Sequence, residues 1–230
     1  MNKNVLLTQL TEKTRELVLL NAELTQLKLS HVICIANKPQ EFLYFPTDGF
    51  ISLVQKIDEH PPLEVGMIGR EGVLGSEIIL GIHENMFGGI VQGSGDAWKI
   101  QVSDFMIHFQ KIPELKLVIY KYLSIRIRQL GLSAACEHFH EIGPRLAKWL
   151  LMSQDRAQSS TFLMTHEFIS LMLGIRRVGV TTTAAEFKRR GLIDYRRGEI
   201  KILDRTRLIK EACSCYRVNI DIYSSTIKKT

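Results

Sequence analysis

The segment that most constrains the fold of this chain runs from Thr165 to about Leu203 and is divided by a capping residue and glycines. Threonine is a favoured N-cap residue, and "HEFISLMLG" after Thr165 repeats apolar residues at helical spacing. Gly174 can take a left-handed conformation and end this helix, and a second periodic segment then runs to Gly191. The stretch predicts two short helices joined by a tight glycine turn and packed through one apolar face. In the second helix the inward positions are Val180, Ala184 and Phe187.

The segment "LIDYRRGEIKIL" follows Gly191 and predicts two short strands around Arg197-Gly198. Helix, glycine turn, helix and hairpin in this order are typical of a winged helix-turn-helix. In that motif the second helix presents its outer face to the major groove of DNA. The alternative is an ordinary helical hairpin with a basic face.

The outer face of the second helix combines short side chains with arginine. Short side chains allow close approach, a threonine methyl can touch a thymine methyl, and arginine can bind guanine O6 and N7. The predicted base-reading residues are Arg177, Val178, Thr181 and Thr182. Residues around this face are predicted to contact phosphates, which position a protein on DNA without specifying sequence. They are Thr165, His166, Arg176, Lys188, Arg196 and Arg197.

Charge is distributed unevenly along the chain. Residues 1–144 carry 13 Lys/Arg and 16 Asp/Glu, whereas residues 145–230 carry 17 Lys/Arg and 8 Asp/Glu. The net charges of −3 and +9 sum to the +6 of the whole chain. A separate basic module of this kind fits a polyanionic partner, double-stranded DNA in this case; the alternative is a solvated basic surface.

Short segments rich in β-branched and aromatic residues lie between positions 30 and 101, separated by Gly, Pro, Asn and Asp. Such spacing predicts a β-sandwich or barrel. Residues 3–29 are predicted to be helical, because their leucines recur at roughly helical spacing. The predicted strands are "VICIA", "EFLYF", "FISLVQKI", "LEVGMI", "GVLGSEIIL", "GGIVQ" and "AWKIQV".

A long helix is predicted after the β segments, with Pro113 in its first turn. Its apolar stripe is more than five turns long. Because the helix is longer than the usual ~11–12 residues and joins two modules, we expect a subunit interface here rather than packing within the chain. The stripe consists of Leu115, Ile119, Leu123, Ile127, Leu130 and Ala134.

Several classes of protein are excluded by what the sequence lacks. No apolar run approaches the roughly 18 residues needed to span a bilayer, and the first apolar segment is too short for a secretory signal. We therefore expect a cytoplasmic protein with no membrane partner. The common phosphate-binding, dinucleotide, metalloprotease and serine-hydrolase motifs are missing, so no enzyme is expected and no catalytic residue is assigned. The four cysteines show no disulfide-scaffold spacing and are interpreted as reduced thiols.

The whole order of segments resembles the cyclic-AMP receptor / fumarate–nitrate regulator (CRP/FNR) family of bacterial transcription factors. "LMLGIRRVGVTTTAAEFKRRGLI" is similar to the helix-turn-helix of that family, and "FLYFPTDGFISLV" and "GREGVLG" are similar to its β-roll. The resemblance implies an α+β fold, a homodimer, a two-fold symmetric DNA site and an effector pocket in the β-roll. It also implies contact with RNA polymerase if the protein is an activator. The expected domains are a jelly-roll β-roll with an N-terminal helix at 1–110, a dimerisation helix at 111–142 and the winged helix-turn-helix at 143–230.

The chain departs from the family members that bind cyclic AMP. Those members carry a Gly-Glu-x-small segment and an Arg-Ser/Thr-Ala segment, but residues 72–75 and 85–89 here contain neither the Glu nor the Arg. Loss of the arginine removes charge-assisted hydrogen bonds worth ~1.5–3 kcal/mol. We expect no tight cyclic-AMP binding, no cofactor and an effector that the sequence does not identify. Arg70 and Glu71 form either a pocket pair or an ion pair; the candidate pocket residues are Arg70, Glu71, Gly72, Val73 and Gly88.

No metal site is predicted. An iron–sulfur cluster like that of some relatives needs several cysteines near the N-terminus, where this chain has only Cys34. Cys136, His138 and His140 are two residues apart, and on a helix such neighbours point in different directions. Cys213-x-Cys215 lacks the four-ligand spacing of a zinc site.

The sequence therefore predicts a dimeric transcription regulator that reads a two-fold symmetric operator. The alternative is an effector-sensing protein that uses the same helices to dock on another protein and does not bind specific DNA.

Overall fold

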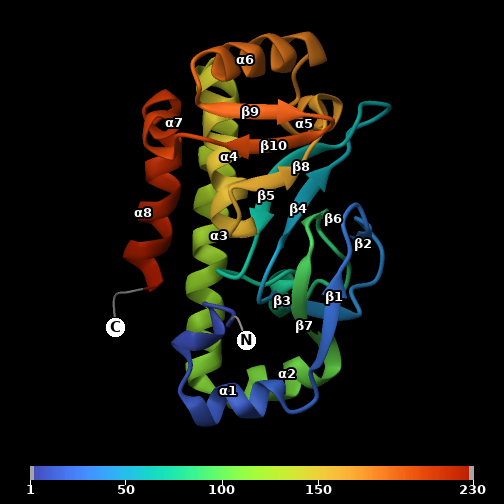
Figure 1. The fold of residues 1–230 in the computed structure, drawn as a ribbon. Coiled ribbons are helices and arrows are strands. Elements are labelled where there is room, and N and C mark those ends of the chain that lie inside the picture. The colour runs from blue at the N-terminus through green and yellow to red at the C-terminus, as the bar shows by residue number, and fades with distance from the viewer. Residues whose placement is uncertain (1–2, 228–230) are drawn as a thin grey trace.

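The computed structural model describes residues 3–227, and it shows a β-sandwich, a long helix and a winged helical domain in chain order (Figure 1). The α+β architecture predicted from the sequence is confirmed. None of the helices in the described part of the chain combines the length and apolar character needed to cross a membrane.

Two antiparallel sheets form the sandwich and bury an apolar layer between them that includes Leu53, Ile68 and Val91. Strands appear in six of the seven predicted segments. The first sheet has the order β1 (Glu23–Leu27), β7 (Gly95–Gln101), β3 (Phe42–Pro46). The second has the order β2 (Val32–Cys34), β6 (Gly88–Gly93), β4 (Phe50–Gln55), β5 (Leu63–Ile68).

The seventh segment, "GVLGSEIIL", was wrongly predicted as a strand. It contains the 3₁₀-helix η2 (Ser76–Leu80), which lies between Gly75 and Gly81, both left-handed with φ of 92° and 81°. Left-handed residues at both ends reverse the chain and prevent an extended strand.

The N-terminal region was also predicted incorrectly in part. Instead of one helix over 3–29, the structure has η1 (Leu7–Gln9), α1 (Glu12–Leu19) and the strand β1. β1 pairs with β7 from Glu23 opposite Lys99 to Leu27 opposite Gly95. This distant partner, with the burial of Leu27, overrides the helical leucine spacing.

Helix α2 (Val102–Lys111) leads into the long helix α3 (Pro113–Phe139), in which Pro113 occupies the first turn as predicted. Leu115 and Ile119 are 0% and 1% exposed, within a core that also contains Phe45 and Phe105. Leu123 is buried as well. The first half of the predicted interface stripe is therefore internal core, and this part of the subunit-interface prediction is wrong.

Within the described residues, the C-terminal domain has three helices before the β9–β10 hairpin of its wing and two after it. α8 returns along α3, so the last helix lies beside the long helix (Figure 1). Strand β8 was not predicted; it pairs with β10 and makes the wing a three-stranded sheet. The elements are α4 (Ile142–Ala157), β8 (Thr161–Leu163), α5 (His166–Leu173), α6 (Arg177–Arg189), β9 (Ile193–Arg196), β10 (Glu199–Ile202), α7 (Arg205–Glu211) and α8 (Cys215–Ile227).

The sandwich and the C-terminal domain share a core. Phe50 and Met67 of the sandwich pack in one apolar cluster with Leu146 and Leu150 of α4 and with Met172 of α5. Because this core is continuous, a change in the sandwich can be transmitted by direct contact to the helices that carry α6.

Candidate nucleic-acid interface

The two predicted helices of the motif form as expected. The Thr165 hydroxyl accepts a hydrogen bond from the Phe168 amide at 3.1 Å and caps α5, which ends at the left-handed Gly174. The predicted inward positions of α6 are confirmed, because all three are at most 3% exposed. They are Val180, Ala184 and Phe187.

The outer face of α6 lies on the side away from the sandwich, at the extremity of the molecule (Figure 1). All four residues predicted to read bases are exposed on it, and Val178 is 68% exposed. Arg177 stands at the N-terminus of α6, where the partial positive charge of the helix adds to that of the guanidinium. The side chains that the sequence analysis grouped are thus brought together: Arg177, Val178, Thr181 and Thr182.

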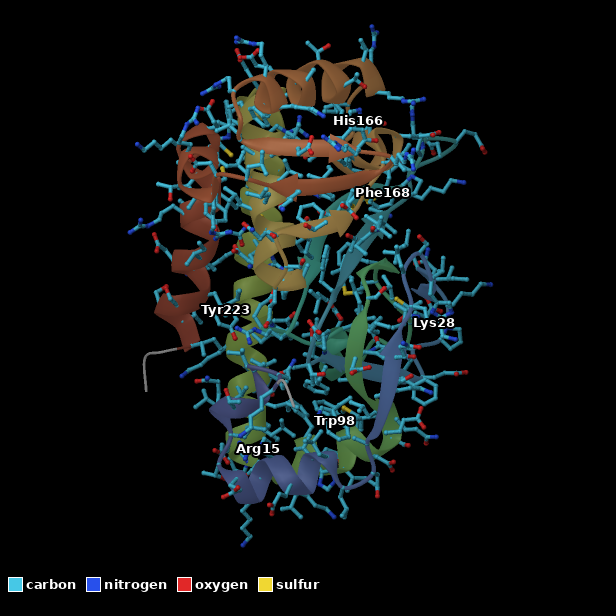
Figure 2. The ribbon with its side chains drawn as sticks, in the orientation of Figure 1. Arg15, Lys28, Trp98, His166, Phe168 and Tyr223 are labelled. Atoms are coloured by element: carbon cyan, nitrogen blue, oxygen red, sulfur yellow. The ribbon has the colours of Figure 1, made fainter. Side chains whose placement is uncertain are left out.

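His166 supports this face rather than projecting from it as a free cation. Figure 2 shows His166 close to α6, and the residue is the first of α5. Its Nδ1 lies 3.2 Å from Thr181 Oγ1, and its ring stacks on Tyr195 with 4.0 Å between centroids. Burial lowers the pKa of His166, and the nearby Arg177 charge lowers it further, so the neutral ring is favoured. The structure therefore gives His166 a positioning contact with Thr181, which differs from the phosphate contact that was predicted.

Lys188 is also engaged within the domain. Its Nζ lies 2.7 Å from the Asp194 carboxylate and donates to the Tyr195 carbonyl at 3.1 Å. These contacts fasten α6 to β9 and offset part of the lysine charge. Lys188 thus holds the wing in place beside the recognition face.

Three of the predicted phosphate-contacting residues remain exposed and basic: Arg176, Arg196 and Arg197. Arg176 precedes α6 at its N-cap position. Arg197 and Gly198 form the wing turn with positive φ of 49° and 80°, which places the Arg197 side chain at the tip of the hairpin. The basic surface thus extends from the start of α6 to the wing.

Arg145 links the motif to the long helix, a contact that sequence reasoning did not identify. Its Nη2 lies 2.6 Å from the Glu137 carboxylate of α3 and donates to the Leu173 carbonyl at 2.6 Å. The arginine thereby satisfies a carbonyl at the C-terminal end of α5 that has no partner within the helix. A buried arginine in the first turn of α4 fixes the orientation of α5 relative to α3.

Of the five predicted effector-pocket residues, Arg70 and Glu71 line one cavity, together with Arg156 and Tyr223, and the other three do not line it. Val73 is fully buried, and a Cβ on Gly72 would lie 2.3 Å from the Tyr122 hydroxyl, so this segment packs tightly against α3. Glu71 pairs with Arg156 of α4 at 2.7 Å, which agrees with an ion-pair role but with a partner other than Arg70. Gly88 lies apart from them on β6, beside Val54. The grouping of these five positions as one pocket is therefore wrong.

Residues 144–211 match the family model of the Crp-like helix-turn-helix domain. No curated protein matches the chain significantly.

Solved structures with the same fold cover nearly the whole chain. A protein described as a transcriptional regulator of the CRP/FNR family from Eubacterium rectale aligns with a TM-score of 0.69 and 19% identity, covering 93% of this chain and 98% of that one. FixK2 from Bradyrhizobium japonicum gives 0.70 and 14%, covering 84% and 98%. A CRP-family transcriptional regulator from Thermus thermophilus gives 0.68 and 18%, covering 82% and 96%. At these identities the likeness shows the fold.

The fold and the exposed face of α6 define a winged helix-turn-helix domain beside a β-sandwich. Residues 144–211 thus match a Crp-like helix-turn-helix domain, and the chain shares its overall fold with solved regulators of the CRP/FNR family.

Proposed function

We propose that the protein acts as a homodimer that reads a two-fold symmetric operator, with one α6 in each of two successive major grooves. The observation that carries the proposal is the exposed outer face of α6, where an arginine and short side chains lie together. Arg177 is proposed to bind guanine, and Val178 to touch a thymine methyl because it cannot accept a hydrogen bond from cytosine.

A seam on the outer side of α3 supports dimerisation. Leu117, Tyr120 and Ile127 are 51%, 54% and 69% exposed, although each is a large apolar side chain. Together with Ala134 they lie three, seven and seven residues apart. This spacing places all four on one side of the helix, as in the contact surface of a helix pair. At Gly131, between the last two, an added Cβ would meet no atom of this chain, so the position is open to close approach by a second helix.

The proposed seam differs from the stripe expected from the sequence. Ile127 and Ala134 belong to both, whereas the buried residues of the stripe face the core. Leu130, from the same stripe, is half-buried at the edge of the seam. α3 is thus apolar on two sides, and the outer side is the one available to a partner subunit.

The direct test is selection of fragments from genomic DNA with the purified full-length protein. We expect enrichment of an inverted repeat whose half-sites are about one helical turn apart, roughly 34 Å. Enrichment of a single unrepeated half-site would contradict the dimeric mode of reading, and no enrichment over input would contradict sequence-specific binding. If the protein activates transcription, the bound dimer is proposed to contact RNA polymerase.

Control by cyclic AMP is not part of the proposal. The segment at 72–75 that would supply the ribose-binding glutamate has Val73 in its place, and Val73 is buried in the core. We expect cyclic AMP to leave the affinity for the selected DNA unchanged in a titration. If micromolar cyclic AMP increased the affinity for DNA, residues other than those at 72–75 would have to bind the nucleotide.

A further inference from the structure

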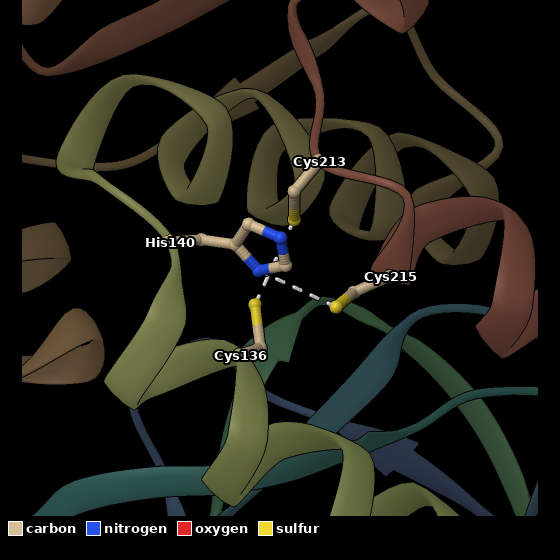
Figure 3. Close-up of side chains that lie close together, drawn as sticks. All are labelled: Cys136, His140, Cys213 and Cys215. Carbon is tan, nitrogen blue, oxygen red and sulfur yellow. Dashed lines mark hydrogen bonds between the residues drawn. The ribbon is translucent and has the colours of Figure 1, made fainter.

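Four potential metal ligands meet at the junction between α3 and the DNA-binding domain (Figure 3). Cys136 lies in the last turn of α3, and His140 is the residue that ends that helix. Cys213 and Cys215 come from the other end of the domain, just before α8 and at its first position. The three sulfur atoms and one imidazole nitrogen all lie within 4.8 Å of one another.

The separations match those of a tetrahedral site. The sulfur atoms of Cys136 and Cys213 are 3.6 Å apart, and Cys215 Sγ is 3.6 Å from His140 Nδ1. Bond lengths of about 2.3 Å to sulfur and 2.0–2.1 Å to nitrogen put two tetrahedral sulfurs about 3.8 Å apart and a sulfur and nitrogen about 3.6 Å apart. The remaining separations are at most 4.8 Å, so binding an ion would draw some ligand atoms together by up to about 1 Å.

We propose that Cys136, His140, Cys213 and Cys215 bind one Zn²⁺ ion. Three thiolates and one imidazole form a closed four-ligand set of the kind found in structural zinc sites. Soft sulfur ligands in a tetrahedral arrangement select zinc over hard cations such as magnesium or calcium. With all ligand atoms this close together, the site holds a single ion.

The burial of the cysteines and the nearby Lys148 favour a zinc site at these four residues. Cys136, Cys213 and Cys215 are 0%, 7% and 5% exposed, so solvent has little access to the sulfurs. Lys148 of α4 places its Nζ 3.1 Å from Cys136 Sγ. Three thiolates leave one excess negative charge around a divalent ion, and this ammonium group neutralises it while holding a ligand in place.

A disulfide explains the cluster less well. A bond between Cys136 and Cys213 would bring their sulfurs from 3.6 Å to about 2.05 Å and would leave Cys215 and His140 without a role. A metal ion accounts for all four side chains together, whereas a disulfide accounts for two of them.

The proposal departs from our expectation of no metal site. That expectation considered neighbours two residues apart, which point in different directions on a helix. Cys136 and His140 are four residues apart and therefore share a face, while their partners lie more than 70 positions further along the chain. Neither pair alone has the spacing of a zinc site.

The proposed ion would link two helices that are distant in the sequence. Only His140 and Glu141 separate α3 from α4, so the proposed ion joins the end of the proposed dimerisation helix directly to the start of α8. It would fix the angle at which the DNA-binding domain leaves that helix.

The first experiment measures zinc in the full-length protein, purified under reducing conditions without chelator. We expect about one zinc per chain by elemental analysis, and a loss of at least about tenfold in zinc content or affinity in Cys213→Ser and Cys215→Ser. Two matched controls lie outside the site: Cys34→Ser in the sandwich and His138→Asn on the exposed side of α3 should keep the full content. His140→Asn should weaken retention.

A second measurement does not depend on how the variants fold. Metal-stripped wild-type protein is titrated with Co²⁺ alone. The expected spectrum has strong thiolate-to-cobalt charge transfer and the intense visible bands of a tetrahedral ion, saturating at about one equivalent. A weak octahedral spectrum, zinc content near zero, or a Cys136–Cys213 disulfide in peptide maps of protein purified without reductant would each overturn the proposal. Loss of zinc in the Cys34 control would overturn the assignment of the ligands.

Discussion

Trp149 donates a hydrogen bond from its indole nitrogen to the Glu64 carboxylate at 3.0 Å, joining α4 of the DNA-binding domain to β5 of the sandwich. Glu64 also contacts the Ser52 hydroxyl on the neighbouring strand. Burial of the Glu64 carboxylate raises its pKa, whereas the hydrogen bonds and the charges of Arg156 and Lys148 lower it. The effect of burial is the larger, and the pKa of Glu64 is raised to about 7. A carboxyl group that titrates near neutral pH therefore lies in the contact between the two domains.

This contact predicts a dependence of stability on pH. Because the pKa of Glu64 is higher in the folded chain than in the unfolded chain, the folded state binds more protons between about pH 4.5 and pH 7, and stability falls as pH rises through that window. Glu64→Gln retains an acceptor for Trp149 without the charge. We expect the variant to be more stable by about 1–3 kcal/mol at pH 8 and to lack this part of the slope.

Urea unfolding at a series of pH values measures the effect. Glu59→Gln, at an exposed position of the β4–β5 loop, is the matched control and should follow the wild-type profile. A Glu64→Gln profile parallel to that of the wild type would show that Glu64 does not titrate in this window.

The helix-turn-helix was predictable because its determinants are local. The cap at Thr165, the turn at Gly174 and the inward spacing from Val180 to Phe187 all act within a few residues. In contrast, β1 exists because it pairs with β7, some 70 residues away. A leucine pattern that fits helical spacing holds no information about such a distant partner.

For the candidate sites too, features set by local sequence were predictable and features set by distant contacts were not. The exposed outer face of α6 follows from one helix, and its residues could be grouped from the sequence alone. Pairing of Lys188 with Asp194 and stacking of His166 on Tyr195 depend on how the wing folds back, which spacing does not reveal. The two apolar sides of α3 could not be distinguished either, since a single periodic stripe does not say which side the core covers.

The ion pair between the buried Arg145 and the half-buried Glu137 predicts a second effect. Arg145→Met preserves most of the side-chain volume but leaves the Leu173 carbonyl and the Glu137 carboxylate without their partner. We expect a loss of about 1–3 kcal/mol in the free energy of unfolding, measured by denaturant titration. Arg189→Met breaks an exposed pair with Glu186 and should cost at most about 1 kcal/mol. Equal losses in the two variants would mean that the Arg145 contacts stabilise the fold no more than an exposed ion pair does.

The proposed seam on α3 predicts which substitution separates the subunits. Ile127→Asp places a charge at a position that is 69% exposed in the single chain, so the chain should still fold. In a dimer the same charge would be buried, and we expect dimer affinity to fall by at least about tenfold. Analytical ultracentrifugation across protein concentrations measures this change. Ile107→Asp on α2, at a position 51% exposed and outside the seam, should leave the association unchanged. If both variants remain dimeric, the subunits meet elsewhere.

The recognition face predicts different results for two arginines on the same basic surface. Arg177→Ala removes the proposed guanine contact, so binding to the selected operator should weaken by about 1–3 kcal/mol and the preference at one base pair of each half-site should relax. Arg197→Gln removes a charge at the wing tip, so binding should weaken by a similar factor on every sequence.

Competition binding against operators varied at single positions, repeated over a range of salt concentrations, distinguishes the two roles. Loss of one phosphate contact lowers the slope of log affinity against log salt by about one per subunit, and Arg197→Gln should show this on operator and random DNA alike. Arg177→Ala should leave binding to random DNA nearly unchanged, because a base contact is not made there. An equal loss on both kinds of DNA for Arg177→Ala would assign that residue to the backbone, and the reading of bases would then rest on Val178, Thr181 and Thr182.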